Sequence, residues 1–135
     1  MSRRPILALD FDGVLHAYTT PWEAADVIPD PATPGALDFL AAAVDRFDVQ
    51  VFSSRSNHPG GIEAMQEWLR NEEMRWRDAR QRAGLPVPGA SVLMKIKWPT
   101  DKPSALVTLD DRAITFTGTW PSLDELAAFK PWNRR

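Results

Sequence analysis

Two aspartates, Asp10 and Asp12, follow the short apolar run 6–9 near the start of the chain. A carboxylate resists burial unless a positive charge or a hydrogen-bond donor compensates it. A divalent cation with oxygen ligands is a partner that suits two carboxylates at this spacing. Such a cation neutralises a bound phosphate and orients it for attack, so the pair predicts chemistry on a phosphate group.

Two further polar clusters stand where apolar runs end. They are Ser53-Ser54-Arg55 after the run 49–52, and Asp110-Asp111-Arg112 after the run 105–109. In open parallel sheets, ligands bind just beyond the carboxyl ends of the strands. We therefore expect both clusters and the first aspartate pair to meet in one crevice, although they lie far apart in the sequence.

The chemistry of such a crevice follows from its residue types. Four carboxylates that meet repel one another, so either some are protonated or a cation lies among them. Oxygen ligands without cysteine or histidine favour Mg²⁺ over zinc. A carboxylate can attack the bound phosphate and form an aspartyl-phosphate, while a hydroxyl and an ammonium group hold the remaining phosphate oxygens.

The segments between these clusters predict the elements that position them. Apolar residues at helical spacing predict helices over 35–46 and 60–83, and a short helix over 123–129. The cap candidates are Thr33 for the first helix, Asn57-His58-Pro59 for the second and Ser122 for the third. The inward-facing residues expected of the third helix are Leu123, Leu126 and Phe129.

Short apolar runs predict the strands, over 6–10, 49–52 and 105–109, with further strands at 91–97 and 114–116. Strands that alternate with helices predict an α/β layer fold with a mainly parallel central sheet. We find no repeat and no interdomain linker, so residues 1–135 are expected to form a single domain.

Composition restricts the class of protein. The chain has 135 residues, of which 44% are hydrophobic and 25% charged, as in an ordinary globular domain. The net charge of −2 gives no general argument for nucleic acid or for an anionic membrane. The absence of cysteine excludes disulfides and thiolate chemistry. The apolar run ends at Asp10, too early for a signal peptide or a membrane span, so we expect a cytoplasmic protein without membrane partners.

The motifs, taken in order, resemble those of haloacid dehalogenase-like (HAD) hydrolases. The segment Asp10-Phe11-Asp12-Gly13-Val14-Leu15 resembles the first motif of that family. Ser53 is similar to the serine or threonine of the second motif, and Lys102-Pro103 with Asp110-Asp111 looks like the third and fourth motifs. The resemblance spans residues 6 to about 118.

The resemblance implies a three-layer Rossmann-like (HAD-like) fold and a role for each motif residue. Asp10 would be the nucleophile, and Asp12 would be the general acid and then the general base, which requires a raised pKa. Ser53 would bond the phosphoryl oxygen, and Lys102 would pair with the nucleophile and the phosphate. The phosphate would lie against Phe11, Asp12, Ser53, Ser54 and Lys102. Mg²⁺ would be held by Asp10, the backbone carbonyl of Asp12, Asp110, and Asp111 directly or through water.

The chain also departs from that family. Lys102 lies only eight residues before Asp110, so Lys95 and Lys97 are rival candidates for the active-site lysine. The segments after Asp12 and after Ser53 leave no room for a separate cap domain, so we expect an open site.

Three functions fit these residues. The first is a Mg²⁺-dependent phosphatase acting on a phosphomonoester of a small molecule or nucleotide. The second is a phosphatase that processes nucleic-acid ends, which suits an open site and Trp22 as a stacking residue, although the net charge opposes it. The third is a catalytically silent binding or regulatory module. Ser53 and Lys102 could also be ordinary strand-end and loop residues, and His16 is expected at the surface or in a loop.

Overall fold

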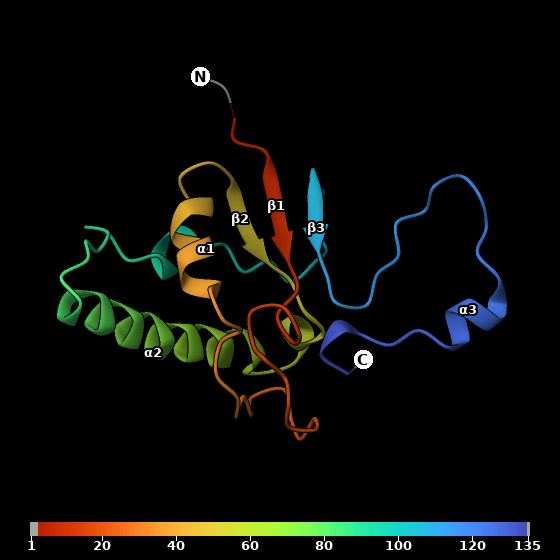
Figure 1. Ribbon diagram of the computed structural model, residues 1–135, viewed down its shortest axis with the longest axis horizontal. Helices are drawn as coiled ribbons and strands as arrows, with labels where there is room; N and C mark the ends of the chain where they lie inside the picture. The colour runs from red at the N-terminus through yellow and green to blue at the C-terminus, as the bar shows by residue number, and fades with distance from the viewer. Residues whose placement is uncertain (1–2, 135) are drawn as a thin grey trace.

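A three-stranded sheet lies at the centre of the computed structural model, which describes residues 3–134. Its strands are β1 (Ile6–Leu9), β2 (Asp48–Val51) and β3 (Val107–Leu109). Their order is β2–β1–β3 and both pairings are parallel (Figure 1). Leu9 lies opposite Val51 on one side and opposite Leu109 on the other. The carboxyl ends of the three strands therefore share one edge, as the sequence predicts.

Two helices cover one face of this sheet. They are α1 (Ala36–Ala43) and α2 (Gly61–Arg82), which contact one another. Leu7, Leu9 and Val49 from the strands form one hydrophobic core with Leu40 of α1 and Met65 of α2. These residues recur at strand spacing in the sheet and at helical spacing in the helices, which explains why their sequence patterns locate both layers.

The direction in which successive strands are added to the sheet reverses between β1 and β3. It runs from β1 through α1 to β2, and then through α2 to Lys97, which pairs in parallel with Gln50 on the outer side of β2. The next strand, β3, lies on the opposite side of β1. A crevice opens at such a reversal, beyond the carboxyl ends of the two strands that flank it. Asp10 and Asp110 follow those two strands.

Several local predictions are wrong. Residues 91–97 contain the 3₁₀ turn Leu93–Lys95 and only the single bridge at Lys97, and residues 114–116 are exposed and form no strand. The predicted caps of the two long helices are also wrong, because Gly35 and Gly60 occupy those positions without a side-chain cap. Thr33 instead donates its hydroxyl to the carbonyl of Val14.

The third helix, α3 (Leu123–Ala127), begins as predicted but packs differently. Ser122 caps it by accepting a hydrogen bond from the Glu125 backbone at 3.0 Å. None of its residues is buried, so the expected inward face is wrong. The helix sits far from the sheet, on a segment that leaves the body of the molecule and returns (Figure 1). Within residues 3–134, the observed layers are therefore the sheet β1–β3 and the helices α1 and α2 that pack on it.

Candidate active site

Three carboxylates converge at the crevice between β1 and β3. One oxygen each from Asp10, Asp110 and Asp111 lies within 4.8 Å of the other two. The pairing of the strands enforces this closeness, because the Asp10 backbone N–H donates to the Leu109 carbonyl at 2.9 Å. The expectation that both ends of the chain contribute aspartates to one place is thus met by the geometry.

The pKa of Asp10 shows what this crowding does. Burial raises it first, a side-chain hydrogen bond with Asp111 raises it further, and the charges of Asp110 and Asp111 add to the effect. A hydrogen bond from the Phe11 backbone opposes the rise, and the resulting pKa of Asp10 is about 8. A cation among these oxygens would remove the repulsion and favour the ionised form. The donor set of carboxylate oxygens fits Mg²⁺.

Gly13 makes room for one of these carboxylates. Its φ of 82° lies in the left-handed region, which glycine adopts without strain. A Cβ atom at this position would collide with the Asp111 carboxylate, which is almost fully buried against the turn. Glycine at this position therefore allows both the turn of the backbone and the close approach of Asp111 to it.

Asp12 lines the same cavity as the three clustered carboxylates but is not one of them, and two other side chains hold it. Arg55 donates to both of its oxygens, from Nε at 2.9 Å and from Nη2 at 3.0 Å. His16 bonds it through Nδ1 at 2.8 Å. Burial alone would raise the pKa of Asp12, but these hydrogen bonds and the charge of Arg55 outweigh it and lower the pKa. The raised pKa expected of Asp12 is therefore wrong.

His16 lies in the loop between β1 and α1, one of its two expected positions, but it is fully buried, so the alternative of a surface position is wrong. The Asp30 backbone N–H donates to its Nε2 at 3.0 Å, which makes Nε2 an acceptor. The neutral ring then carries its hydrogen on Nδ1 and donates it to Asp12. His16 thus ties Asp12 to the loop that ends at Asp30.

Arg55, for which the motifs predict no role, is the main partner of Asp12. It is almost completely buried, and its Nη1 donates to three loop carbonyls at 2.8–3.1 Å, those of Ala24, Ala25 and Val27. Its guanidinium lies 4.5 Å from the ring centroid of Trp22. The sequence signal that could have identified it is its position directly after Ser53-Ser54 at the end of a strand. A basic side chain at a carboxyl strand end can reach a neighbouring carboxylate.

A cavity of about 300 Å³ contains the aspartates and opens beside two aromatic rings. Its lining residues are Asp10, Asp12, Tyr18, Trp22, Ser54, Asp110, Asp111 and Arg112. Ser53 is not among them, because it is buried and its Oγ accepts from the Arg55 backbone at 3.1 Å as the cap of the 3₁₀ turn Ser54–Asn57. The Phe11 side chain is likewise buried, against Trp68.

The three candidate lysines occupy different places. Lys102 lines a second cavity of about 350 Å³ together with Asp10 and Asp110. Lys95 and Lys97 instead lie 3.5 and 3.1 Å from the carboxylates of Asp45 and Asp48. Asp48 begins β2, so Lys97 is directed toward the amino-terminal edge of the sheet, away from the aspartate cluster.

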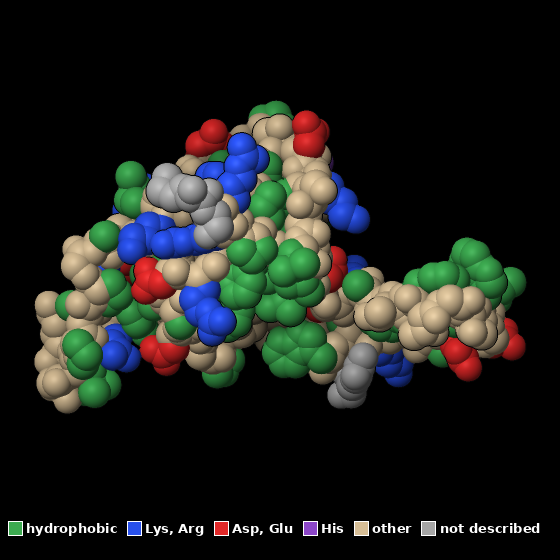
Figure 2. Space-filling model, turned by 90° about the horizontal axis from the view of Figure 1, so that it is seen from above, with side chains coloured by type: hydrophobic (Ala, Val, Ile, Leu, Met, Phe, Trp, Pro, Cys, Tyr) green, Lys and Arg blue, Asp and Glu red, His purple; other side chains and the backbone are tan. Residues whose placement is uncertain are grey.

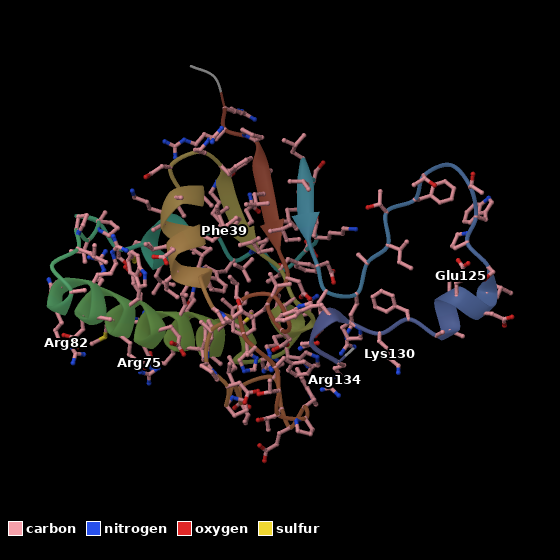
Figure 3. The ribbon with its side chains drawn as sticks, viewed as in Figure 1. Phe39, Arg75, Arg82, Glu125, Lys130 and Arg134 are labelled. Atoms are coloured by element: carbon pink, nitrogen blue, oxygen red, sulfur yellow. The ribbon has the colours of Figure 1, made fainter. Side chains whose placement is uncertain are left out.

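Residues 132–134 pack against the loop that follows Asp12, a contact that no local pattern predicts. Trp132 donates its Nε1–H to the Gly13 carbonyl at 2.7 Å, and Asn133 donates to the Ala17 carbonyl at 3.1 Å. The Arg134 guanidinium lies 5.8 Å from the centroid of the Tyr18 ring. Arg134 accordingly lies below the carboxyl ends of the strands in Figure 3.

Comparison of the chain with protein-family models, with curated proteins and with solved structures found no significant match. Within residues 3–134, no helix is both long enough and apolar enough to cross a membrane.

Proposed function

We propose that this chain is a Mg²⁺-dependent phosphomonoester hydrolase that works through an aspartyl-phosphate on Asp10. The observation that carries the proposal is the convergence of oxygens from Asp10, Asp110 and Asp111 within 4.8 Å at the carboxyl edge of a parallel sheet. The order of the motifs, which resembles that of HAD-like hydrolases, supports it. Membership of that family and a three-layer fold without a cap domain belong to the same proposal.

Mg²⁺ would be held by Asp10, Asp110, Asp111 and the backbone carbonyl of Asp12, and would neutralise the charge of the bound phosphate. An Asp10 oxygen attacks phosphorus as the bond from phosphorus to the leaving oxygen breaks. Water then attacks phosphorus, gives its proton to Asp12 and releases inorganic phosphate from Asp10. Ser54 and Arg112 line the cavity, and the hydroxyl of Ser54 and the guanidinium of Arg112 would bond phosphate oxygens. Lys102 would act from the adjoining cavity.

The ion pair of Asp12 affects the first of these steps. Because its pKa is lowered, Asp12 is ionised at neutral pH and suits the role of base better than that of acid. An aryl leaving group departs as a stable phenolate and needs no proton, whereas an alkyl leaving group does. We therefore expect aryl phosphates to be better substrates than alkyl phosphates, and the difference to grow as pH rises.

The test is hydrolysis of 4-nitrophenyl phosphate with Mg²⁺ and with a chelator. We expect turnover that requires Mg²⁺, and a loss of several orders of magnitude in kcat for Asp10→Asn, because an amide cannot act as the nucleophile. Asp78→Asn is the matched control, since Asp78 lies on α2 and, among residues 3–134, forms an ion pair only with Arg82. Equal activity in Asp10→Asn and the control would refute the assigned nucleophile. No turnover over a broad panel of phosphomonoesters would favour the silent binding module.

The cavity favours one second candidate, an enzyme acting on a nucleotide or on a nucleic-acid end. Trp22 lines the cavity, is 45% exposed, and is fixed by the guanidinium of Arg55. Stacking of a base on such a ring contributes about 1–3 kcal/mol. Trp22→Leu should then raise KM for a nucleoside monophosphate while leaving KM for glycerol phosphate unchanged. Equal changes in KM for both substrates would show that Trp22 does not stack on a nucleobase. Preference for an oligonucleotide over the mononucleotide would favour end processing.

A further inference from the structure

Residues 112–131, hereafter the arm, project from the body of the molecule although both of their ends are attached at the candidate active site. Asp111, directly before the arm, is buried in the aspartate cluster. Trp132, directly after it, bonds the Gly13 carbonyl. Between these points the chain runs out beyond β3 and returns, and it carries α3 at its far end (Figure 1).

The arm bears large apolar side chains that its own chain leaves in solvent. Trp120 is 83% exposed and Leu123 is 82% exposed. The others with more than two-fifths of their surface exposed are Ile114, Phe116 and Leu126. The rings of Phe116 and Trp120 lie 4.7 Å apart, and hydrophobic side chains gather on the projecting part of the surface (Figure 2). Concentrated apolar exposure of this kind marks an interaction surface.

A second apolar surface of the same chain lies along β3. Among residues 3–134 this strand pairs only with β1, so its outer edge presents unpaired backbone groups. Val107 and Leu109 are 46% and 41% exposed on the face that α1 and α2 cover elsewhere. Beside them a groove of about 180 Å³ is lined by Leu109, by the exposed Phe39 of α1 (Figure 3) and by other uncharged residues. We call this surface the β3 groove.

The total surface area indicates how much of the molecule is left uncovered. The chain exposes 8870 Å², whereas a compact monomer of 15.2 kDa would expose about 7,100 Å². The excess of about 1,800 Å² lies within the roughly 1,000–2,500 Å² that each subunit of a permanent dimer buries. The uncovered area is therefore of the size that one stable protein interface requires.

We propose that the chain forms a two-fold symmetric dimer in which the arm of each subunit packs on the β3 groove of the other. Two-fold symmetry needs each subunit to supply both halves of the contact, and this chain carries both an apolar arm and an uncharged apolar groove. The arm begins shortly after β3, so the exchange brings the two β3 strands together. Because both ends of the arm are attached at the aspartate cluster, the dimer interface borders both active sites.

The first experiment measures the mass of the full chain in solution by size-exclusion chromatography with light scattering. We expect a particle of about 30 kDa, twice the mass of the chain. The double variant Phe116→Glu with Trp120→Glu should be a folded monomer by circular dichroism, because neither side chain is buried in its own subunit. The control is Met94→Glu, which alters an 80% exposed side chain outside both surfaces and should stay dimeric.

The second experiment locates the contact, and it uses the absence of native cysteine. Chains with Val107→Cys are mixed with chains with Phe116→Cys and treated with a short bifunctional maleimide. We expect cross-linked pairs that join the two kinds of chain, and far fewer when Met94→Cys replaces Val107→Cys. Neither experiment requires catalytic activity, so the proposal stands or fails independently of the proposed function.

Four results would overturn it. A monomeric wild-type chain at high micromolar concentration is the first, and a dimer that survives both glutamate substitutions is the second. The third is a cross-link that forms only inside a single chain carrying both cysteines, which would show that the arm closes over its own β3. The fourth is purification of the chain in a stoichiometric complex with a different protein on the arm.

Discussion

Asp10→Asn in the metal-free protein tests the electrostatic reasoning about the aspartate cluster directly. Folding raises the pKa of Asp10 from 3.8 to about 8, mainly because of its burial and its contact with Asp111. The folded state then binds one proton more tightly than the unfolded chain does. The contribution of Asp10 to stability therefore favours folding at low pH and is lost progressively as pH rises from about 4 to about 8. Asparagine is neutral at every pH and can donate to Asp111 as protonated Asp10 does, so the variant should lack this dependence.

The magnitude follows from the linkage between protons and stability. Where the folded state holds one more proton than the unfolded chain, the free energy of unfolding falls by at most ~1.4 kcal/mol per pH unit. The site is open to solvent on one side, which reduces this value. We therefore expect the free energy of unfolding of Asp10→Asn at pH 8 to exceed that of wild type by about 1–3 kcal/mol. For a chain of this length that gain corresponds to a rise in Tm of roughly 3–10 °C.

The assay is urea unfolding at several pH values between 5 and 8, with a chelator and then with millimolar Mg²⁺. Wild type should lose stability with pH only when metal is absent, because Mg²⁺ binds the folded state and favours the ionised carboxylates. Asp10→Asn should respond weakly to Mg²⁺, and the control Asp78→Asn should behave like wild type. A metal-free Asp10→Asn variant that is less stable than wild type at pH 8 would refute the view that these carboxylates repel one another.

Two further substitutions test the supports of the site. Arg55→Lys should lower the free energy of unfolding, measured with urea above pH 4, by about 2–4 kcal/mol. The reason is that a lysine cannot bridge both oxygens of Asp12 and leaves buried acceptors unpaired. A loss no larger than that of the exposed Arg70→Lys would contradict this. Gly13→Ala should reduce stability by at least ~1 kcal/mol and abolish stabilisation by Mg²⁺, because its Cβ would displace the adjacent carboxylate. Gly89→Ala, which meets no neighbour, is its control.

The sequence by itself located the elements that carry the site. Apolar runs of strand length ending in polar residues identified β1, β2 and β3, and helical spacing identified α1 and α2. Both signals are local, because the periodicity of an element determines which of its side chains face the core. The rule that ligands bind at carboxyl strand ends was then enough to bring Asp10 and Asp110 together.

Only the tertiary structure decided the partners of these residues. Arg55 lies 43 positions from Asp12 in the chain, and no periodicity links the two, so the lowered pKa of Asp12 could not be read from the sequence. The environment of Leu123 depends in the same way on what packs against it. Its spacing predicts an inward face, yet residues 3–134 of its own chain leave it 82% exposed. A local pattern specifies which residues require burial or a charged partner, but long-range packing determines whether and by what that requirement is met.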